Sequence, residues 1–155
     1  MKMRVIAVGQ RPPAWVESGF DDYARRLPRE LALILKEIPV ASRRALPIER
    51  ARRQEGERIC AELAARDWVV ALDVEGRMQT TSGLAERLGH WMEQGRDVAF
   101  LIGGPDGLDP ICTARADERL SLSALTFPHG LVRVMLAEQL YRAWTVRAGH
   151  PYHRA

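Results

Sequence analysis

Short apolar runs alternate with longer amphipathic stretches along the whole chain. The apolar runs are typical of buried strands, since most of them stop at glycine, proline or an acidic turn; they cover residues 3–8, 31–38, 68–72, 97–102 and 120–125. The stretches between them predict helices, which cover residues 13–27, 47–65, 82–93 and 128–148, with a short helix starting at residue 110. Strands alternating with helices predict an α/β fold, a single domain over residues 1–155 with a mostly parallel sheet and helices on both faces.

Several helix ends carry local signals. Ser82 is the expected N-cap of its helix, and Asp109 followed by Pro110 predicts the start of the short helix. Gly149 and Pro151 predict where the last helix stops.

The last predicted helix, over residues 128–148, is apolar around most of its circumference. A helix of this kind is buried on more than one side. One side can pack on the sheet and another on a second copy of the protein. We therefore predict a homodimer through this C-terminal helix, while a central core helix in a monomer is the alternative that the pattern leaves open.

Composition indicates an ordinary globular protein, with 155 residues, 46% hydrophobic and 28% charged. No apolar stretch approaches the roughly 20 residues that span a bilayer, and the N-terminal run is too short for a signal peptide core. Cys60 and Cys112 fall on separate predicted helices without a CxxC partner, so neither a disulfide framework nor a zinc site is indicated. We expect a cytoplasmic protein with no membrane partner.

Arginine dominates the basic residues of the chain. Lysine occurs only at Lys2 and Lys36, so 21 of the 23 basic residues are arginine, and the net charge is +3. Arginine suits bidentate phosphate contacts and stacking on bases, although a preference for arginine codons explains the bias equally well. Arginines between residues 25 and 53 can line a surface for RNA phosphates, but each alone is more often a solvated helix face; they are Arg25, Arg26, Arg29, Arg43, Arg44, Arg50, Arg52 and Arg53.

Two apolar strands end in loops of bare backbone, one at Gly-Gly-Pro-Asp-Gly (residues 103–107) and one at residues 121–129. At the carboxyl ends of neighbouring strands, exposed N–H and C=O groups form a cradle for a small polar ligand such as a nucleoside. The glycine motif is neither the dinucleotide fingerprint nor a phosphate loop, so hydride transfer and nucleotide hydrolysis lose support. By itself it is more often a tight turn, and the second loop is what favours a ligand site.

Four motifs in order carry a resemblance over essentially the whole chain, at residues 101–108, 122–129, 136–144 and 150–154. With them the chain resembles the ribosomal RNA large subunit methyltransferase H family of the SPOUT superfamily. The resemblance implies a cytoplasmic homodimer that transfers a methyl group from S-adenosylmethionine to N3 of a pseudouridine in 23S ribosomal RNA, on the assembled ribosome. It also implies that the C-terminal part of the sheet is threaded into a trefoil knot.

The resemblance further implies which residues hold the methyl donor: Leu72, Gly103, Leu122, Ser123, Ala124, Leu125, Thr126 and Phe127. Glycine admits close backbone approach, and leucine side chains can sandwich an adenine ring. Taken alone, each leucine is more simply a core residue.

Methylation of a ring nitrogen by a sulfonium donor is a single displacement, which needs no metal and no nucleophilic cysteine. We hypothesise that Arg154 or Arg142 stabilises the anion developing on the base, while His153 or a water takes the proton. Tyr152 is a candidate for stacking on the target base, and His129 is better explained as a structural loop residue. Whether this tail serves its own cavity or a partner's is open.

Two other classes of function remain. A SPOUT enzyme acting on transfer RNA would share the donor site and differ in RNA docking. A non-catalytic ribosome- or RNA-binding module would keep the fold, but the Tyr152-His153-Arg154 tail argues against it.

Overall fold

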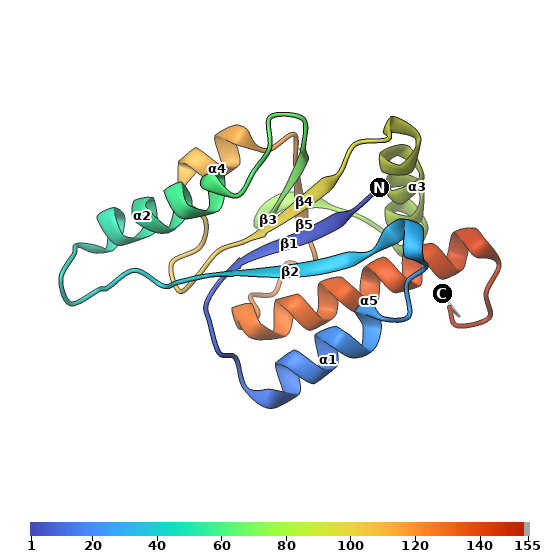
Figure 1. The fold of residues 1–155 in the computed structure, drawn as a ribbon, viewed down its shortest axis with the longest axis horizontal. Helices are drawn as coiled ribbons and strands as arrows, with labels where there is room; N and C mark the ends of the chain where they lie inside the picture. Colours follow the sequence, from blue (N-terminus) through green and yellow to red (C-terminus); the bar gives the residue numbers. More distant parts are fainter. Residues whose placement is uncertain (154–155) are drawn as a thin grey trace.

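Five parallel strands form one sheet in the computed structural model, which describes residues 1–153 (Figure 1). The strands are β1 (Met3–Val8), β2 (Leu33–Ile38), β3 (Trp68–Met78), β4 (Val98–Ile102) and β5 (Glu118–Ser121). Their order is β2-β1-β4-β3-β5, and every neighbouring pair is parallel. The predicted α/β fold with a parallel sheet is confirmed; the trefoil knot stays a prediction.

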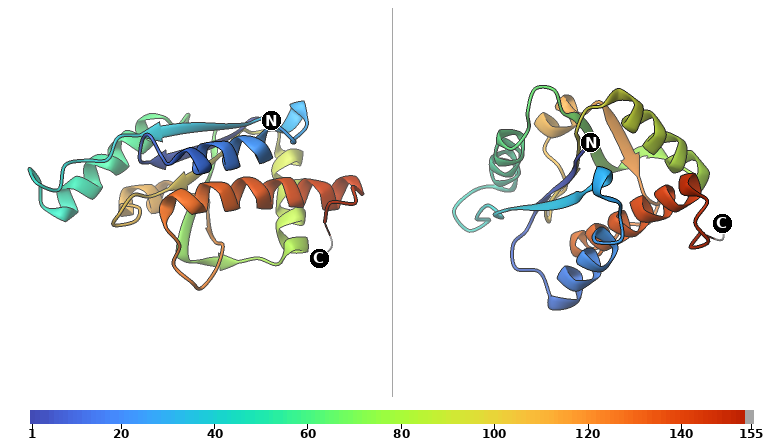
Figure 2. Two further views of the ribbon diagram at one scale, coloured as in Figure 1. Left: turned by 90° about the horizontal axis from the view of Figure 1, so that it is seen from below. Right: turned by 45° about the vertical axis from the view of Figure 1, so that its right-hand side comes forward.

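Helices cover both faces of the sheet, as predicted (Figure 2). They are α1 (Ala14–Ala24), α2 (Ile48–Ala61), α3 (Thr81–Gln94), α4 (Pro110–Arg115) and α5 (His129–Ala148), with a 3-10 turn at Arg29–Leu31. Apolar residues of α1, α3 and α5 share one core with the sheet, while α2 and α4 pack in a second core on the other face. None of the helices within residues 1–153 is long and apolar enough to cross a membrane.

The nearly all-apolar pattern of α5 is explained partly within one chain. The helix packs against both α1 and α3, and Leu136, Ala137 and Leu140 are completely buried. Partly buried Val132, together with Trp144 on the C-terminal half of the helix, adds apolar surface at the margin of this core. The homodimer therefore stays a prediction.

Predicted helix ends are correct where the signal is local. The Asp109 carboxylate accepts a hydrogen bond from the N–H of Ile111 at 2.9 Å, and Pro110 opens α4. Gly149, at φ 68°, ends α5. The predicted cap Ser82 is wrong, because the extended residue before α3 is Thr80, whose hydroxyl accepts from the N–H of Gly83 at 3.0 Å.

Strand β3 is longer than predicted and is interrupted by a bulge. Leu72 and Arg77 both pair with Leu120 of β5, so residues 73–76 project out of the sheet. A Cβ on Gly76 would lie 2.8 Å from the backbone of Leu120, so only glycine fits there without movement. The sequence pattern indicates a strand end at Asp73; instead the chain leaves the ladder for four residues and returns.

A partly buried carboxylate anchors the start of β5. Glu118 accepts hydrogen bonds from the indole N–H groups of Trp68 at 2.5 Å and Trp91 at 2.6 Å, and it pairs with Arg87 at 2.8 Å. Burial by itself raises the pKa of Glu118, but Arg87 and the two indoles outweigh it and hold that pKa below its usual value. The carboxylate therefore ties α3, β3 and β5 together in its ionised form.

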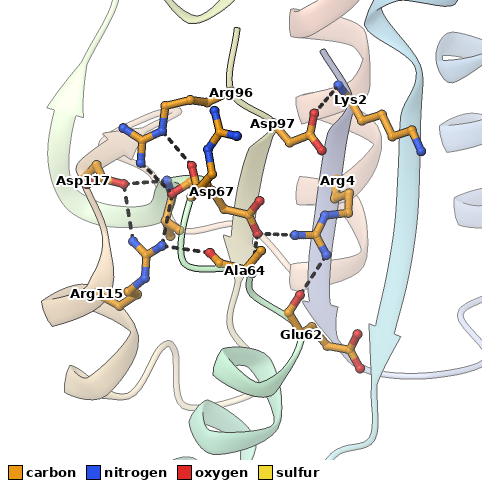
Figure 3. A network of polar contacts seen from close by, with 11 residues as sticks. Lys2, Arg4, Glu62, Ala64, Asp67, Arg96, Asp97, Arg115 and Asp117 are labelled. Atoms are coloured by element: carbon orange, nitrogen blue, oxygen red, sulfur yellow. Dashed lines mark hydrogen bonds and ion pairs between the residues drawn. The ribbon is translucent and has the colours of Figure 1, made fainter. Parts of the chain in front are cut away.

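A polar network holds the amino ends of the strands (Figure 3). Arg4 of β1 pairs with Asp67 and donates to the carbonyl of Glu62 at 2.8 Å. Arg115 and Arg96 donate to carbonyl groups of the turn at residues 64–67. This edge of the sheet is tied by ion pairs, whereas the carboxyl edge is open to a cavity.

Candidate functional site

A cavity of about 660 Å³ lies at the carboxyl ends of β3, β4 and β5 beside the start of α5. Its walls are the bulge of β3, the glycine loop after β4, the loop after β5 and the first turn of α5. A volume in this range is typical of sites for small molecules. Ligands of open α/β sheets bind at this edge, where the strands end and backbone groups are free.

Residues predicted to hold the methyl donor converge here. The cavity is lined by Leu72, Gly103, Leu122, Ser123, Leu125, Thr126 and Phe127. Ala124 is exposed and is not among the lining residues. The structure thus brings together three segments that are far apart in the sequence.

Glycine at position 103 is required by the backbone of its own loop. A Cβ there would lie 2.4 Å from the carbonyl carbon of Gly107 and 2.6 Å from the nitrogen of Leu108. The turn is closed by the N–H of Gly107, at φ 78°, which donates to the oxygen of Gly104 at 3.1 Å. The glycines of this folded-back loop present main chain to the cavity without a side chain of their own.

An arginine fixes the outer side of the glycine loop. Arg43 pairs with Asp106 of the loop at 2.9 Å and with Glu55, a completely buried carboxylate of α2. Glu55 first, and then Asp106, raise the pKa of Arg43 against the opposing effect of burial. The charged guanidinium therefore holds the loop against α2.

The loop after β5 is shaped by its own serines. The Ser121 hydroxyl donates to the oxygen of Ser123 at 2.9 Å, and the Ser123 hydroxyl accepts from the N–H of Leu125 at 3.0 Å. These local bonds replace strand pairing, so β5 ends at Ser121 and the strand predicted over residues 120–125 is too long. Leu125 is 70% exposed and lies at the cavity wall, where it can cover an apolar face of a ligand.

Acidic residues on the bulge line the cavity and were not among the predicted site residues. Burial acts to raise the pKa of Asp73, but the N–H of Glu75 and the guanidinium of Arg119, at 2.5 Å, together lower it. Glu75 is exposed and makes no ion pair with any residue from 1 to 153. Asp73 is held by Arg119 while Glu75 is unpaired within residues 1–153, and two carboxylates on one wall favour a cationic ligand. Their position directly after a predicted strand is the feature of the sequence that could have identified them.

The C-terminal tail folds back onto α5. Tyr152 donates from its hydroxyl to Glu138 at 3.0 Å and packs edge-on against Tyr141, with ring centroids 4.6 Å apart. Arg142 lies over the Tyr152 ring and pairs with Glu138 at 2.5 Å. Burial, with Tyr23 and Glu138, raises the pKa of Tyr152, so the phenol stays protonated.

The Nδ1 of His153 is buried without a hydrogen-bond partner among residues 1–153. Arg154, the other predicted residue of the tail, lies outside the described residues.

The tail and the cavity lie at opposite ends of α5 in one chain. The helix starts beside the carboxyl ends of the strands, and residues 149–153 follow its other end (Figure 1). At 1.5 Å per residue, His129 at the cavity and Arg142 are separated by about 20 Å along the helix. The structure therefore does not bring Arg142 and Tyr152 into the cavity of their own chain.

Neither Cys60 nor Cys112 is among the residues that line the cavity. Burial, and the neighbouring Cys60, raise the pKa of Cys112 to about 12, so its thiol stays protonated near neutral pH. Within residues 1–153 there is no group of three or more His, Cys, Asp or Glu arranged to hold a metal ion.

The chain matches a known class of methyltransferase. Its cavity lies at the edge of a parallel α/β sheet, between the glycine loop and the loop that Ser121 and Ser123 hold. Residues 1–153 match the family model described as "Predicted SPOUT methyltransferase". The chain belongs to this family and, within it, to the ribosomal RNA large subunit methyltransferase H family.

Two similar full-length relatives carry the name "Ribosomal RNA large subunit methyltransferase H", from Methylococcus capsulatus and Chromohalobacter salexigens. Each is 52% identical over 155 residues, which cover 99% of this chain and 100% of the relative. Among solved structures, a probable methylase family protein from Haemophilus influenzae Rd KW20 aligns with 99% of this chain and 70% of its own. Its TM-score is 0.57 at 11% identity, which shows a shared fold.

Proposed function

We propose that the protein methylates N3 of a pseudouridine in 23S ribosomal RNA, using S-adenosylmethionine, on the assembled ribosome in the cytoplasm. The observation that carries this proposal is the convergence of the predicted donor residues on one cavity of about 660 Å³. The names of the full-length relatives support ribosomal RNA of the large subunit as the substrate.

The residues of the cavity fit the methyl donor. Backbone groups of Gly103 and of residues 122–127 can read the edge of an adenine, while Leu72, Leu122 and Leu125 can cover its faces. The carboxylates of the bulge lie on a wall where the positive charge of the donor would be stabilised. When bound, S-adenosylmethionine supplies an electrophilic methyl group.

The remaining task is to align the target nitrogen and to remove its proton. The N–C bond forms while the S–C bond breaks, so holding both reactants in line is itself a large part of catalysis. We assign charge stabilisation to Arg154 or Arg142, proton transfer to His153 or a water, and stacking on the base to Tyr152.

A homodimer would bring this tail to a cavity. Because α5 separates Tyr152 from the cavity of its own chain, a symmetric dimer with antiparallel copies of α5 would place each tail beside the cavity of the partner. The buried Nδ1 of His153, unsatisfied among residues 1–153, is in keeping with a tail that is completed by contacts from another molecule.

Methyl transfer from labelled donor to ribosomes, free large subunits, naked ribosomal RNA and transfer RNA tests the reaction. We expect N3-methylpseudouridine in ribosomal RNA, identified by mass spectrometry. Label in transfer RNA would assign the protein to a different substrate class, and donor binding without any transfer would favour a non-catalytic module.

Mixed dimers test the placement of the tail. One chain would lack residues 152–155, and the other would carry Gly103→Ala in the donor cavity. Recovered activity in the mixture, with each parent inactive alone, would show that the tail acts across the interface. Absence of recovery with intact mixed dimers would place the tail at its own cavity.

A further inference from the structure

The arginine-rich segment of the sequence divides into paired and free residues in the structure. Arg43 and Arg52 are held by carboxylates of α2, the glycine loop or the start of α4. Arg44 and Arg50 are exposed and make no ion pair or hydrogen bond from their side chains within residues 1–153. The same is true of Arg11, which has a left-handed backbone at φ 51°.

These three free arginines lie on the same edge of the sheet as the cavity. Arg11 is in the loop that follows β1, Arg44 is in the loop that follows β2, and Arg50 is in the first turn of α2. Strand β1 lies between β2 and β4, and the carboxyl end of β4 carries the glycine loop. The free arginines therefore lie to one side of the cavity, over the two strands that the cavity does not cover.

Contacts join both loops to the cavity wall. After β2, Arg43 bonds to Asp106, which lines the cavity. After β1, a Cβ on Gly9 would lie 3.4 Å from the Nε2 of His129, and His129 lines the cavity as well. The loops are thus continuous with the site.

The loops after β1 and β2 and the first turn of α2 carry a net positive charge. Residues 9–13 and 39–50 contain four arginines and one carboxylate, Glu49. Since Arg43 is neutralised by its two partners, three free arginines face one exposed acid. Trp15, 57% exposed at the start of α1, adds an aromatic face next to the loop that carries Arg11.

We propose that Arg11, Arg44 and Arg50 form the surface on which phosphates of the substrate ribosomal RNA dock beside the donor cavity. This inference rests on the proposed function for the identity of the RNA. Guanidinium groups bind phosphate oxygens in bidentate geometry, and such contacts set position and register without reading sequence. Trp15 offers a face on which an unpaired base stacks.

Charge reversal at two of these positions tests the surface. The variant Arg44→Glu/Arg50→Glu is compared with Lys2→Glu/Arg66→Glu, a pair with the same change in charge. Lys2 and Arg66 are exposed, lack ion pairs within residues 1–153 and lie before β1 and β3, at the opposite edge of the sheet. Arg11→Asn is tested separately, because asparagine tolerates the left-handed backbone at that position.

Binding to ribosomes that carry labelled 23S ribosomal RNA is measured at several salt concentrations, together with donor binding and melting temperature. We expect the Arg44/Arg50 variant to lose about tenfold or more in RNA affinity, and the slope of log affinity against log salt to fall by about 0.7 for each lost phosphate contact. Donor affinity and melting temperature should remain those of the parent. The control pair should change RNA affinity only slightly.

Equal RNA affinity and salt slope in the test and control variants would overturn the docking surface, whether or not the parent methylates RNA. Selective loss of binding in the test variant supports the surface even if no methyl transfer is detected. In that case the proposed reaction fails while the docking surface stands.

Discussion

A buried arginine in α5 provides the most demanding test of how this fold is held together. Arg133 is 1% exposed, although it carries a charged side chain. Its guanidinium donates to the oxygen of Gly9 at 2.6 Å, to Glu37 at 2.7 Å and to the oxygen of Val8 at 3.3 Å. These bonds tie α5 to the ends of β1 and β2. We predict that Arg133→Met destabilises the protein while keeping much of the side-chain volume.

The expected loss follows from these bonds. Each of the two short, charge-assisted bonds contributes about 1.5–3 kcal/mol, and the longer bond to Val8 contributes less. Glu37 is 31% exposed, so water replaces part of what it loses. We expect a net loss of about 3 kcal/mol in the free energy of unfolding. For a chain of this size, that is a fall in melting temperature of about 6–12 °C.

Urea unfolding at fixed protein concentration measures the loss, because dimerisation would make stability depend on concentration. Arg147→Met on the same helix is the matched control, since the Arg147 side chain is bonded within residues 1–153 only to the oxygen of Ala85 at 3.5 Å. A double-mutant cycle with Glu37→Gln isolates the ion pair. A loss below about 1 kcal/mol for Arg133→Met would refute the reasoning that these bonds stabilise the fold.

Three further outcomes follow from the structure. Gly103→Ala should weaken S-adenosylmethionine binding about tenfold or more in calorimetric titrations, because the new Cβ meets backbone at 2.4 Å; Gly130→Ala, with 3.4 Å of room, should leave it unchanged. Because the pKa of Glu118 in the folded state is below its unfolded value, the stability that Glu118 contributes is present at neutral pH and is lost as pH falls below about 4.5 through the folded pKa. In Glu118→Gln the urea midpoint should therefore depend less on pH between about pH 5 and 3 than in the parent. Tyr152→Phe removes a 3.0 Å hydrogen bond to Glu138 and should lower the free energy of unfolding measured in urea by about 1 kcal/mol.

Local signals in the sequence were reliable where the physical cause is also local. The cap at Asp109 and the stop at Gly149 depend on neighbouring backbone groups, and both are confirmed. Strand ends were less reliable, because a strand continues only as far as its neighbour pairs with it. The bulge after Leu72 is set by the approach of β5, which lies more than 40 residues further along the chain.

The order of apolar runs and helices determined the α/β class, and with it the edge of the sheet where loops after strands meet. That rule predicted that the loop at residues 103–107 and the loop at residues 121–129 share a ligand site. The family resemblance added Leu72 and the individual residues of the loops, and the structure places all of them except Ala124 at one cavity.

Tertiary structure alone decided the rest. Arg133 is joined to Glu37 across 96 positions, and Arg43 to Asp106 across 63. Contacts of that separation determine which arginines are neutralised and which stay unpaired within residues 1–153. No local window of sequence contains both partners of such a contact, so charge and polarity along the chain predict the kinds of residue at the site but not which of them act together.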